Sequence, residues 1–150
     1  MEVRAGISLV STWEEAPQLP ARPRKLSLLV IDDDPVHRMV IGKVGEKANY
    51  VLTTAASVED ATIKLQEHKF DCISLDLSLG GENGAQVLGT IAQYNKQALV
   101  IIVSGASAKV REETLRLAQL LNIKVMEAPK PVDLISLRGK LTAHSDTIKS

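Results

Sequence analysis

Short apolar runs alternate along the chain with longer stretches in which apolar residues recur every three or four positions. Five runs have the length of buried strands: residues 26–31, 50–56, 71–77, 98–103 and 123–126. Helical spacing follows each run, in stretches that begin near Pro35, Ser57, Val87, Ser107 and Val132. Strands that alternate with helices favour a parallel sheet covered on both faces, because parallel neighbours need crossover connections. The pattern therefore predicts an α/β fold.

The beginning of the chain differs from the rest. Residues 1–25 contain three prolines and no sustained period, so we interpret them as a poorly ordered extension or linker. A single domain is expected over residues 26–142, followed by a tail over residues 143–150. A chain of 150 residues is long enough for one such domain with its own core.

The composition narrows the function classes. Eighteen basic residues balance eighteen acidic ones, so the chain has no net positive charge with which to hold nucleic acid. The longest apolar runs are far shorter than the roughly 20 residues of a membrane-spanning helix, and we expect no signal peptide. Cys72 is the single cysteine, which excludes an intramolecular disulfide and favours a cytoplasmic location.

Polar residues stand where the predicted strands end. Along the chain they are Asp32, Asp33, Asp76, Ser104 and Lys130. Ligands of open α/β sheets bind outside the carboxyl ends of the strands, so we expect these residues to converge there. Clustered carboxylates repel each other unless a cation neutralises them, and a cluster of oxygen ligands favours Mg²⁺.

The converging groups suit the transfer of a phosphoryl group. Asp76 is the candidate acceptor because it is a single acid at the end of an apolar strand, and carboxylates are known covalent nucleophiles. A Mg²⁺ ion held by a few carboxylates keeps coordination positions free for phosphoryl oxygens. Ser104 is placed to donate a hydrogen bond to such an oxygen, and Lys130 to supply a positive charge.

The histidines, the glycine-rich run and Cys72 are interpreted as structural residues and not as parts of a site. His37, His68 and His144 are dispersed without metal-ligand spacing and are predicted to lie on the surface. The glycine-rich run at residues 80–84 lacks the spacing of a phosphate-binding loop and predicts a flexible turn. Cys72 is predicted to be a small core residue.

Four motifs in this order resemble the receiver domain of two-component response regulators. They are residues 29–35 (LVIDDDP), 73–84 (ISLDLSLGGENG), 101–105 (IIVSG) and 128–131 (APKP). The resemblance covers residues 26–141 and implies a flavodoxin-like (βα)5 three-layer sandwich with the parallel sheet order 2-1-3-4-5. The stretch between Ser104 and Asp133 also resembles receivers fused to EAL-type cyclic-di-GMP phosphodiesterases.

The resemblance implies roles for individual residues. Asp32 and Asp33 match the acidic pair that holds the metal, and Asp76 matches the phosphoacceptor, which is also a metal ligand. Ser78 matches the position whose backbone carbonyl completes the Mg²⁺ shell.

Two further residues match the family's switch, and one departs from it. Ser104 matches the switch hydroxyl and Lys130 the lysine of the Lys-Pro turn. Where the family usually has an aromatic residue this chain has Glu127, which cannot fill an apolar slot without burying a charge. We therefore expect phosphorylation with a modified readout.

The resemblance also implies partners. The phosphodonor is a histidine kinase or a phosphotransfer protein, and an effector protein binds the face between the fourth strand and the fifth helix. We expect a phosphoacceptor signalling domain and not an enzyme, with neither nucleic acid nor membrane bound directly; a homodimer is left open. Two alternatives also stay open. One is a haloacid-dehalogenase-like phosphatase, which expects a second aspartate where Ser78 stands, and the other is a receiver that is never phosphorylated.

Overall fold

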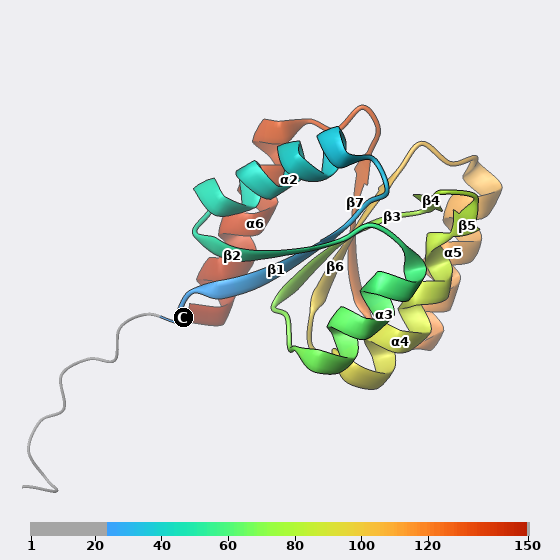
Figure 1. The fold of residues 1–150 in the computed structure, drawn as a ribbon, viewed down its shortest axis with the longest axis horizontal. Coiled ribbons are helices and arrows are strands. Elements are labelled where there is room, and N and C mark those ends of the chain that lie inside the picture. The colour runs from blue at the N-terminus through green and yellow to red at the C-terminus, as the bar shows by residue number, and fades with distance from the viewer. Residues whose placement is uncertain (1–23, 150) are drawn as a thin grey trace, which may run out of the picture.

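Five apolar runs form the strands of one parallel sheet, and its three inner strands are buried on both faces. The computed structural model describes residues 24–149, and residues 1–23 of the predicted extension lie outside that range. The sheet order is β2-β1-β3-β6-β7, which confirms the predicted flavodoxin-like order 2-1-3-4-5 (Figure 1). Its strands are β1 (Leu26–Ile31), β2 (Tyr50–Ala55), β3 (Cys72–Asp76), β6 (Leu99–Ser104) and β7 (Lys124–Pro129).

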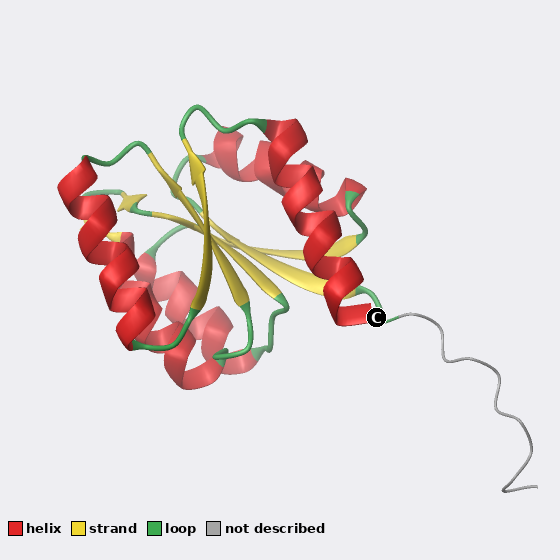
Figure 2. Cartoon of the chain, turned by 180° about the vertical axis from the view of Figure 1, so that it is seen from behind, coloured by secondary structure: helices red, strands yellow, loops and turns green. Residues whose placement is uncertain are grey.

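Helices cover both faces of this sheet and complete the three-layer sandwich (Figure 2). One face carries α2 (Pro35–Lys47) and α6 (Leu134–Lys149). The other face carries α3 (Val58–Glu67), α4 (Val87–Tyr94) and α5 (Ala108–Leu120). Within residues 24–149, every helix is too short or too polar to cross a lipid bilayer.

Each central strand contributes side chains to two separate apolar cores. Leu28 and Val30 of β1 pack with residues of α2 and α6. Leu29 and Ile31, their neighbours in the chain, pack on the opposite side with residues of α3 and α4. Burial on both faces explains why the strands read as continuous apolar runs and not as an alternating pattern. Cys72 is fully buried in β3, as predicted.

The C-terminal helix is longer than the sequence pattern predicts. Residues 143–149, expected to be a tail, form the last part of α6. Two hydrogen bonds hold α6 against the sheet: the Tyr50 hydroxyl donates to the Leu141 carbonyl at 2.7 Å, and His144 Nε2 lies 2.9 Å from the Asp71 carbonyl oxygen. The helix that the sequence pattern placed over residues 132–141 therefore continues to Lys149.

The glycine-rich run contains a two-residue turn at the tip of a short hairpin, which agrees with the predicted turn. Strands β4 (Ser78–Leu79) and β5 (Glu82–Asn83) pair in antiparallel register across Gly80 and Gly81. These two glycines have φ angles of +55° and +89°. Positive φ at both central residues suits a tight two-residue turn and favours glycine. The hairpin leads into a 3-10 helix, η1 (Gly84–Gln86), and so connects β3 to α4.

Candidate functional site

Two buried aspartates meet at the carboxyl edge of the sheet. Asp32 follows β1 and Asp76 ends β3, and these two strands are direct neighbours. The side chains are 1% and 3% exposed, respectively. Each carboxylate accepts a backbone hydrogen bond at 2.9 Å, Asp32 from the N–H of Asp34 and Asp76 from the N–H of Ser78. Both side chains are thus held in one pocket by the turns that follow their strands.

Lys130 contributes the positive charge of this pocket. Its Nζ donates a hydrogen bond to Asp76 Oδ2 at 3.1 Å. The backbone N–H of Lys130 donates to the Ser104 carbonyl at 3.0 Å, and the Lys130–Pro131 peptide bond is cis. The backbone hydrogen bond joins the end of β7 to the end of β6. The Lys130 ammonium group thus reaches the Asp76 carboxylate, which belongs to β3.

The pocket carries more negative charge than Lys130 neutralises. Burial raises the pKa of Asp76, and the neighbouring Asp32 carboxylate raises it further. The hydrogen bonds from Ser78 and Lys130 act in the opposite direction, but the net pKa lies above its usual value. A divalent cation would relieve this repulsion, so the donor set of buried carboxylate oxygens fits a metal ion.

The other predicted site residues lie at the same edge with different partners. Asp33 Oδ2 accepts the N–H of Gly80 at 3.0 Å, which joins the end of β1 to the β4–β5 hairpin. Ser78 begins β4, directly beyond Asp76. Ser104 ends β6, and its Oγ accepts the N–H of Ala106 at 2.7 Å. Hydrogen bonds therefore join Asp76 to Ser78 and Lys130, whereas Asp33 and Ser104 bond to adjacent loops.

His37 lies in the pocket, so its predicted surface position is wrong. The Asp34 side chain caps α2 by accepting the N–H groups of Val36 and His37, and the first turn of the helix directs His37 back toward the strand end. His37 Nδ1 contacts Asp32 Oδ2, and the histidine side chain is 24% exposed. Ligand atoms of Asp32, His37 and Asp76 lie within 4.8 Å of one another. The sequence does offer one indication that His37 belongs to the pocket, because it stands in the first helical turn after the pair Asp32 and Asp33.

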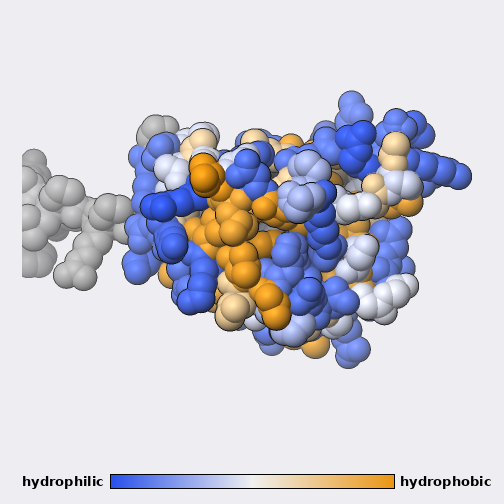
Figure 3. All heavy atoms as spheres, turned by 90° about the horizontal axis from the view of Figure 1, so that it is seen from above, coloured by the Kyte–Doolittle hydropathy of each residue, from blue (hydrophilic) through white to orange (hydrophobic). Residues whose placement is uncertain are grey.

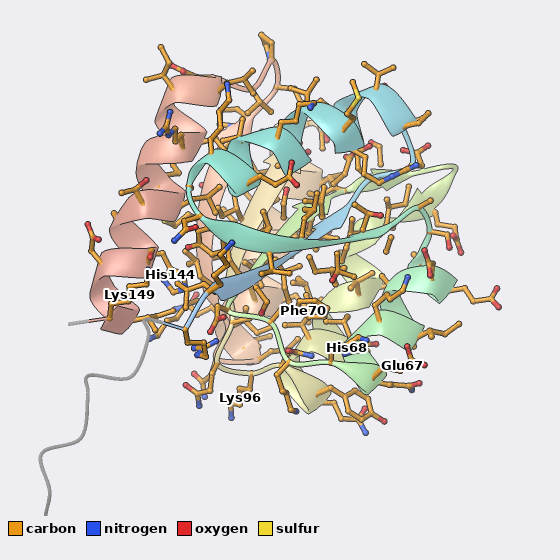
Figure 4. All side chains as sticks on the ribbon, turned by 60° about the vertical axis from the view of Figure 1, so that its left-hand side comes forward. Glu67, His68, Phe70, Lys96, His144 and Lys149 are labelled. Carbon is orange, nitrogen blue, oxygen red and sulfur yellow. The ribbon has the colours of Figure 1, made fainter. Side chains whose placement is uncertain are left out.

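The other two histidines lie far from this pocket. Figure 4 labels His68 and His144 in its lower part, away from α2 at the top. His68 stands just before β3 and His144 contacts Asp71, at the amino end of that strand. They are thus separated from Asp76 by the length of β3.

Gly84 permits a close backbone approach under the acceptor residue. A Cβ atom at this position would lie 2.2 Å from the Asp76 carbonyl oxygen and 2.9 Å from the Leu77 Cα. The N–H of Gly84 donates to the Leu77 carbonyl at 2.9 Å. The sequence pattern indicates only a turn at this glycine, whereas in the structure its lack of a side chain lets the chain pass directly behind Asp76.

The Glu127 side chain, on β7, is partly exposed and is not buried in the core. Its Oε1 accepts a hydrogen bond from Arg111 Nη1 of α5 at 2.9 Å, and both side chains are more than a third exposed. The carboxylate thus avoids the burial that an aromatic residue would have there. An exposed ion pair of this kind contributes little to stability, but it connects α5 to β7.

An exposed apolar band lies beside the pocket, over α2 and the start of α6 (Figure 3). Its large side chains are Val36, Met39, Leu134 and Ile135, and Ile135 is 87% exposed. A groove of about 640 Å³ between the two helices continues from Leu134 and Ile135 to Asp146. Exposed apolar patches of this kind mark surfaces that bind other proteins.

Comparison with known proteins identifies relatives of the chain. Residues 28–137 match the family model described as the response regulator receiver domain. The chain is 30% identical over 120 residues to the sensory/regulatory protein RpfC of Xanthomonas campestris pv. campestris, an alignment that covers 75% of this chain and 15% of RpfC. The chain thus corresponds to a small part of that longer relative.

Solved structures share the fold. A CheY-like response regulator receiver domain from Methanospirillum hungatei has a TM-score of 0.72 at 19% identity, over 83% of this chain and 96% of that one. A response regulator protein from Burkholderia pseudomallei, solved with a phosphorylated aspartic acid, a calcium ion and citrate, has a TM-score of 0.68 at 21% identity. That likeness covers 82% of this chain and 70% of the other.

Proposed function

Because the chain belongs to the response regulator receiver domain family, we propose that Asp76 is the residue that accepts the phosphoryl group. The donor in this proposal is the phosphohistidine of a histidine kinase or of a phosphotransfer protein. The observation that carries it is the buried pair Asp32 and Asp76 with Lys130 Nζ bonded to Asp76 at 3.1 Å. This is the arrangement of charges that an anionic phosphoryl group needs in order to approach a carboxylate.

The chemical step uses residues of the pocket in defined roles. A carboxylate oxygen of Asp76 forms a bond to phosphorus, the bond from phosphorus to the donor nitrogen breaks, and its electron pair stays on the donor imidazole. Lys130 stabilises the negative charge of the group in transfer. A divalent cation, proposed to be Mg²⁺ held by Asp32, Asp33, Asp76 and the Ser78 carbonyl, would add positive charge at the phosphoryl oxygens.

The direct test is intact mass spectrometry of the full chain after incubation with acetyl phosphate and MgCl₂. We expect a gain of one phosphoryl group per chain, because a small acyl phosphate replaces the protein donor without requiring its docking surface. The gain should disappear when EDTA removes the divalent cation. An unmodified mass for folded protein with MgCl₂ present would contradict the proposal.

Phosphorylation is proposed to reach the surface through Ser104. Its hydroxyl oxygen accepts the N–H of Ala106, in the loop that precedes α5. A hydroxyl that turns to donate to the phosphoryl group would give up this bond and release the loop. The Arg111–Glu127 pair connects α5 to β7. We propose that an effector binds the face between the fourth strand of the sheet, β6, and the fifth helix, α6.

The phosphodonor is proposed to dock on the exposed apolar band. Ile135→Ser removes the most exposed apolar side chain of the band and should weaken transfer from a phosphohistidine protein about fivefold, as a rise in KM. The matched control Leu120→Ser removes a side chain of 76% exposure from α5 and should have no such effect. Both variants should be phosphorylated by acetyl phosphate at the wild-type rate. Equal rates of protein-to-protein transfer in the two variants would contradict this docking surface.

We further propose that the chain is a phosphoacceptor and not an enzyme that turns over free phosphoesters. Ser78 stands where a haloacid-dehalogenase-like phosphatase expects its second aspartate. Sustained hydrolysis of p-nitrophenyl phosphate, lost in Asp76→Asn, would contradict this proposal. We also propose a cytoplasmic location, where the single cysteine, Cys72, stays reduced.

A further inference from the structure

A nitrogen ligand stands in the pocket beside the two buried carboxylates. His37 Nδ1 contacts Asp32 Oδ2, and the ligand atoms of Asp32, His37 and Asp76 all lie within 4.8 Å of one another. The three side chains come from the turn after β1, from the first turn of α2 and from the end of β3. Three potential ligands from separate elements thus face one small volume.

The surrounding structure holds these three ligands in place. Asp32 and Asp76 each accept a backbone hydrogen bond at 2.9 Å on one carboxylate oxygen. His37 belongs to a helix whose amino end is capped by Asp34. Preorganised ligands of this kind lower the cost of ordering a metal site.

Asp32, His37 and Asp76 together offer one nitrogen ligand as well as carboxylate oxygens. Asp33 Oδ2 bonds to Gly80, so the third group that converges with Asp32 and Asp76 is the imidazole of His37. Mg²⁺ prefers oxygen ligands, whereas imidazole suits Zn²⁺ and other first-row transition metals. Three protein ligands with a fourth position open to water is a common arrangement for Zn²⁺.

We propose that Asp32, His37 and Asp76 form a Zn²⁺ site that competes with Mg²⁺ for the same carboxylates. The inference rests on the proposed function only in that both use this pocket. Zn²⁺ binding requires the imidazole nitrogen, whereas the proposed Mg²⁺ ligands are all oxygens. The two ions are therefore expected to depend differently on His37.

Titration of the full metal-free chain tests this site. Isothermal titration calorimetry with ZnCl₂ and, separately, with MgCl₂ measures both affinities for the wild-type chain and for His37→Gln. Loss of one of three ligands should weaken Zn²⁺ binding about tenfold or more, and Mg²⁺ binding should change less than about twofold. CoCl₂ gives a second readout, since visible absorption bands of bound Co²⁺ should change in His37→Gln.

A matched control separates the pocket from binding at other histidines. His68→Gln removes a histidine at the far end of β3 and should leave the Zn²⁺ affinity unchanged. Equal Zn²⁺ affinities of wild type and His37→Gln overturn the proposal, and so does an equal loss in His37→Gln and His68→Gln. Phosphorylation by acetyl phosphate is measured independently, so its failure contradicts the proposed function and leaves the Zn²⁺ result standing.

Discussion

Replacing Asp76 by asparagine is expected to abolish phosphorylation of the chain by acetyl phosphate. The amide keeps the shape of the side chain but lacks the anionic oxygen that forms the bond to phosphorus. Intact mass spectrometry after incubation with acetyl phosphate and MgCl₂ measures the result. Asp146→Asn, which removes an exposed carboxylate near the end of α6, is the matched control and should be phosphorylated like the wild type. A phosphoryl group that still appears in Asp76→Asn would assign the acceptor to another residue.

The thermal stability of Asp76→Asn tests whether the ionised Asp76 carboxylate destabilises the folded state. Since burial raises the pKa of Asp76, its ionised form disfavours the folded state. This penalty is absent below the pKa of the unfolded chain, about 4, and is complete once the pH exceeds the raised pKa of the folded state. Without divalent cations, Asp76→Asn should therefore unfold at a higher temperature than the wild type near neutral pH, and the difference should vanish toward about pH 4. A less stable variant near neutral pH would contradict the raised pKa of Asp76 and the burial that causes it.

Replacing Gly84 by alanine is expected to damage both the fold and the site. The new Cβ would meet the Asp76 carbonyl oxygen at 2.2 Å, and backbone atoms cannot move aside as the end of a side chain can. Overpacking of this kind costs about 1–3 kcal/mol of the free energy of unfolding. Because the displaced backbone is that of the acceptor residue, the rate of phosphorylation by acetyl phosphate should fall as well. Urea unfolding and time-resolved mass spectrometry measure the two effects.

A second glycine provides the control for this substitution. Gly89 lies within α4, and a Cβ atom there would have no other atom within 4 Å. Gly89→Ala should therefore raise the free energy of unfolding by about 0.5–1 kcal/mol, through the higher helix propensity of alanine. Wild-type stability of Gly84→Ala would contradict this prediction, because it would show that the backbone behind Asp76 accommodates a Cβ atom.

The elements of the fold could be predicted because their causes are local in the chain. A strand buried on both faces needs consecutive apolar residues, and β1 coincides with the predicted run of residues 26–31. A side-chain cap acts on backbone groups two or three positions away, so Ser57 and Ser107 marked the starts of α3 and α5. The order of the strands has no local cause and came from the resemblance to a family. The end of α6 was missed because it depends on a tertiary contact, that of His144 with the Asp71 carbonyl.

The composition of the pocket was decided by the tertiary structure. Asp32 and Asp33 are adjacent and chemically identical, yet Asp32 is buried beside His37 while Asp33 bonds to Gly80. The close approach of Gly84 to Asp76 likewise depends on how the chain returns behind β3. The sequence by itself determined which residue types reach the carboxyl edge of the sheet, because strand ends are set by short-range patterns. Which of those groups touch was decided only when helices and loops packed, because such contacts depend on separations of a few ångströms between segments that no local pattern controls.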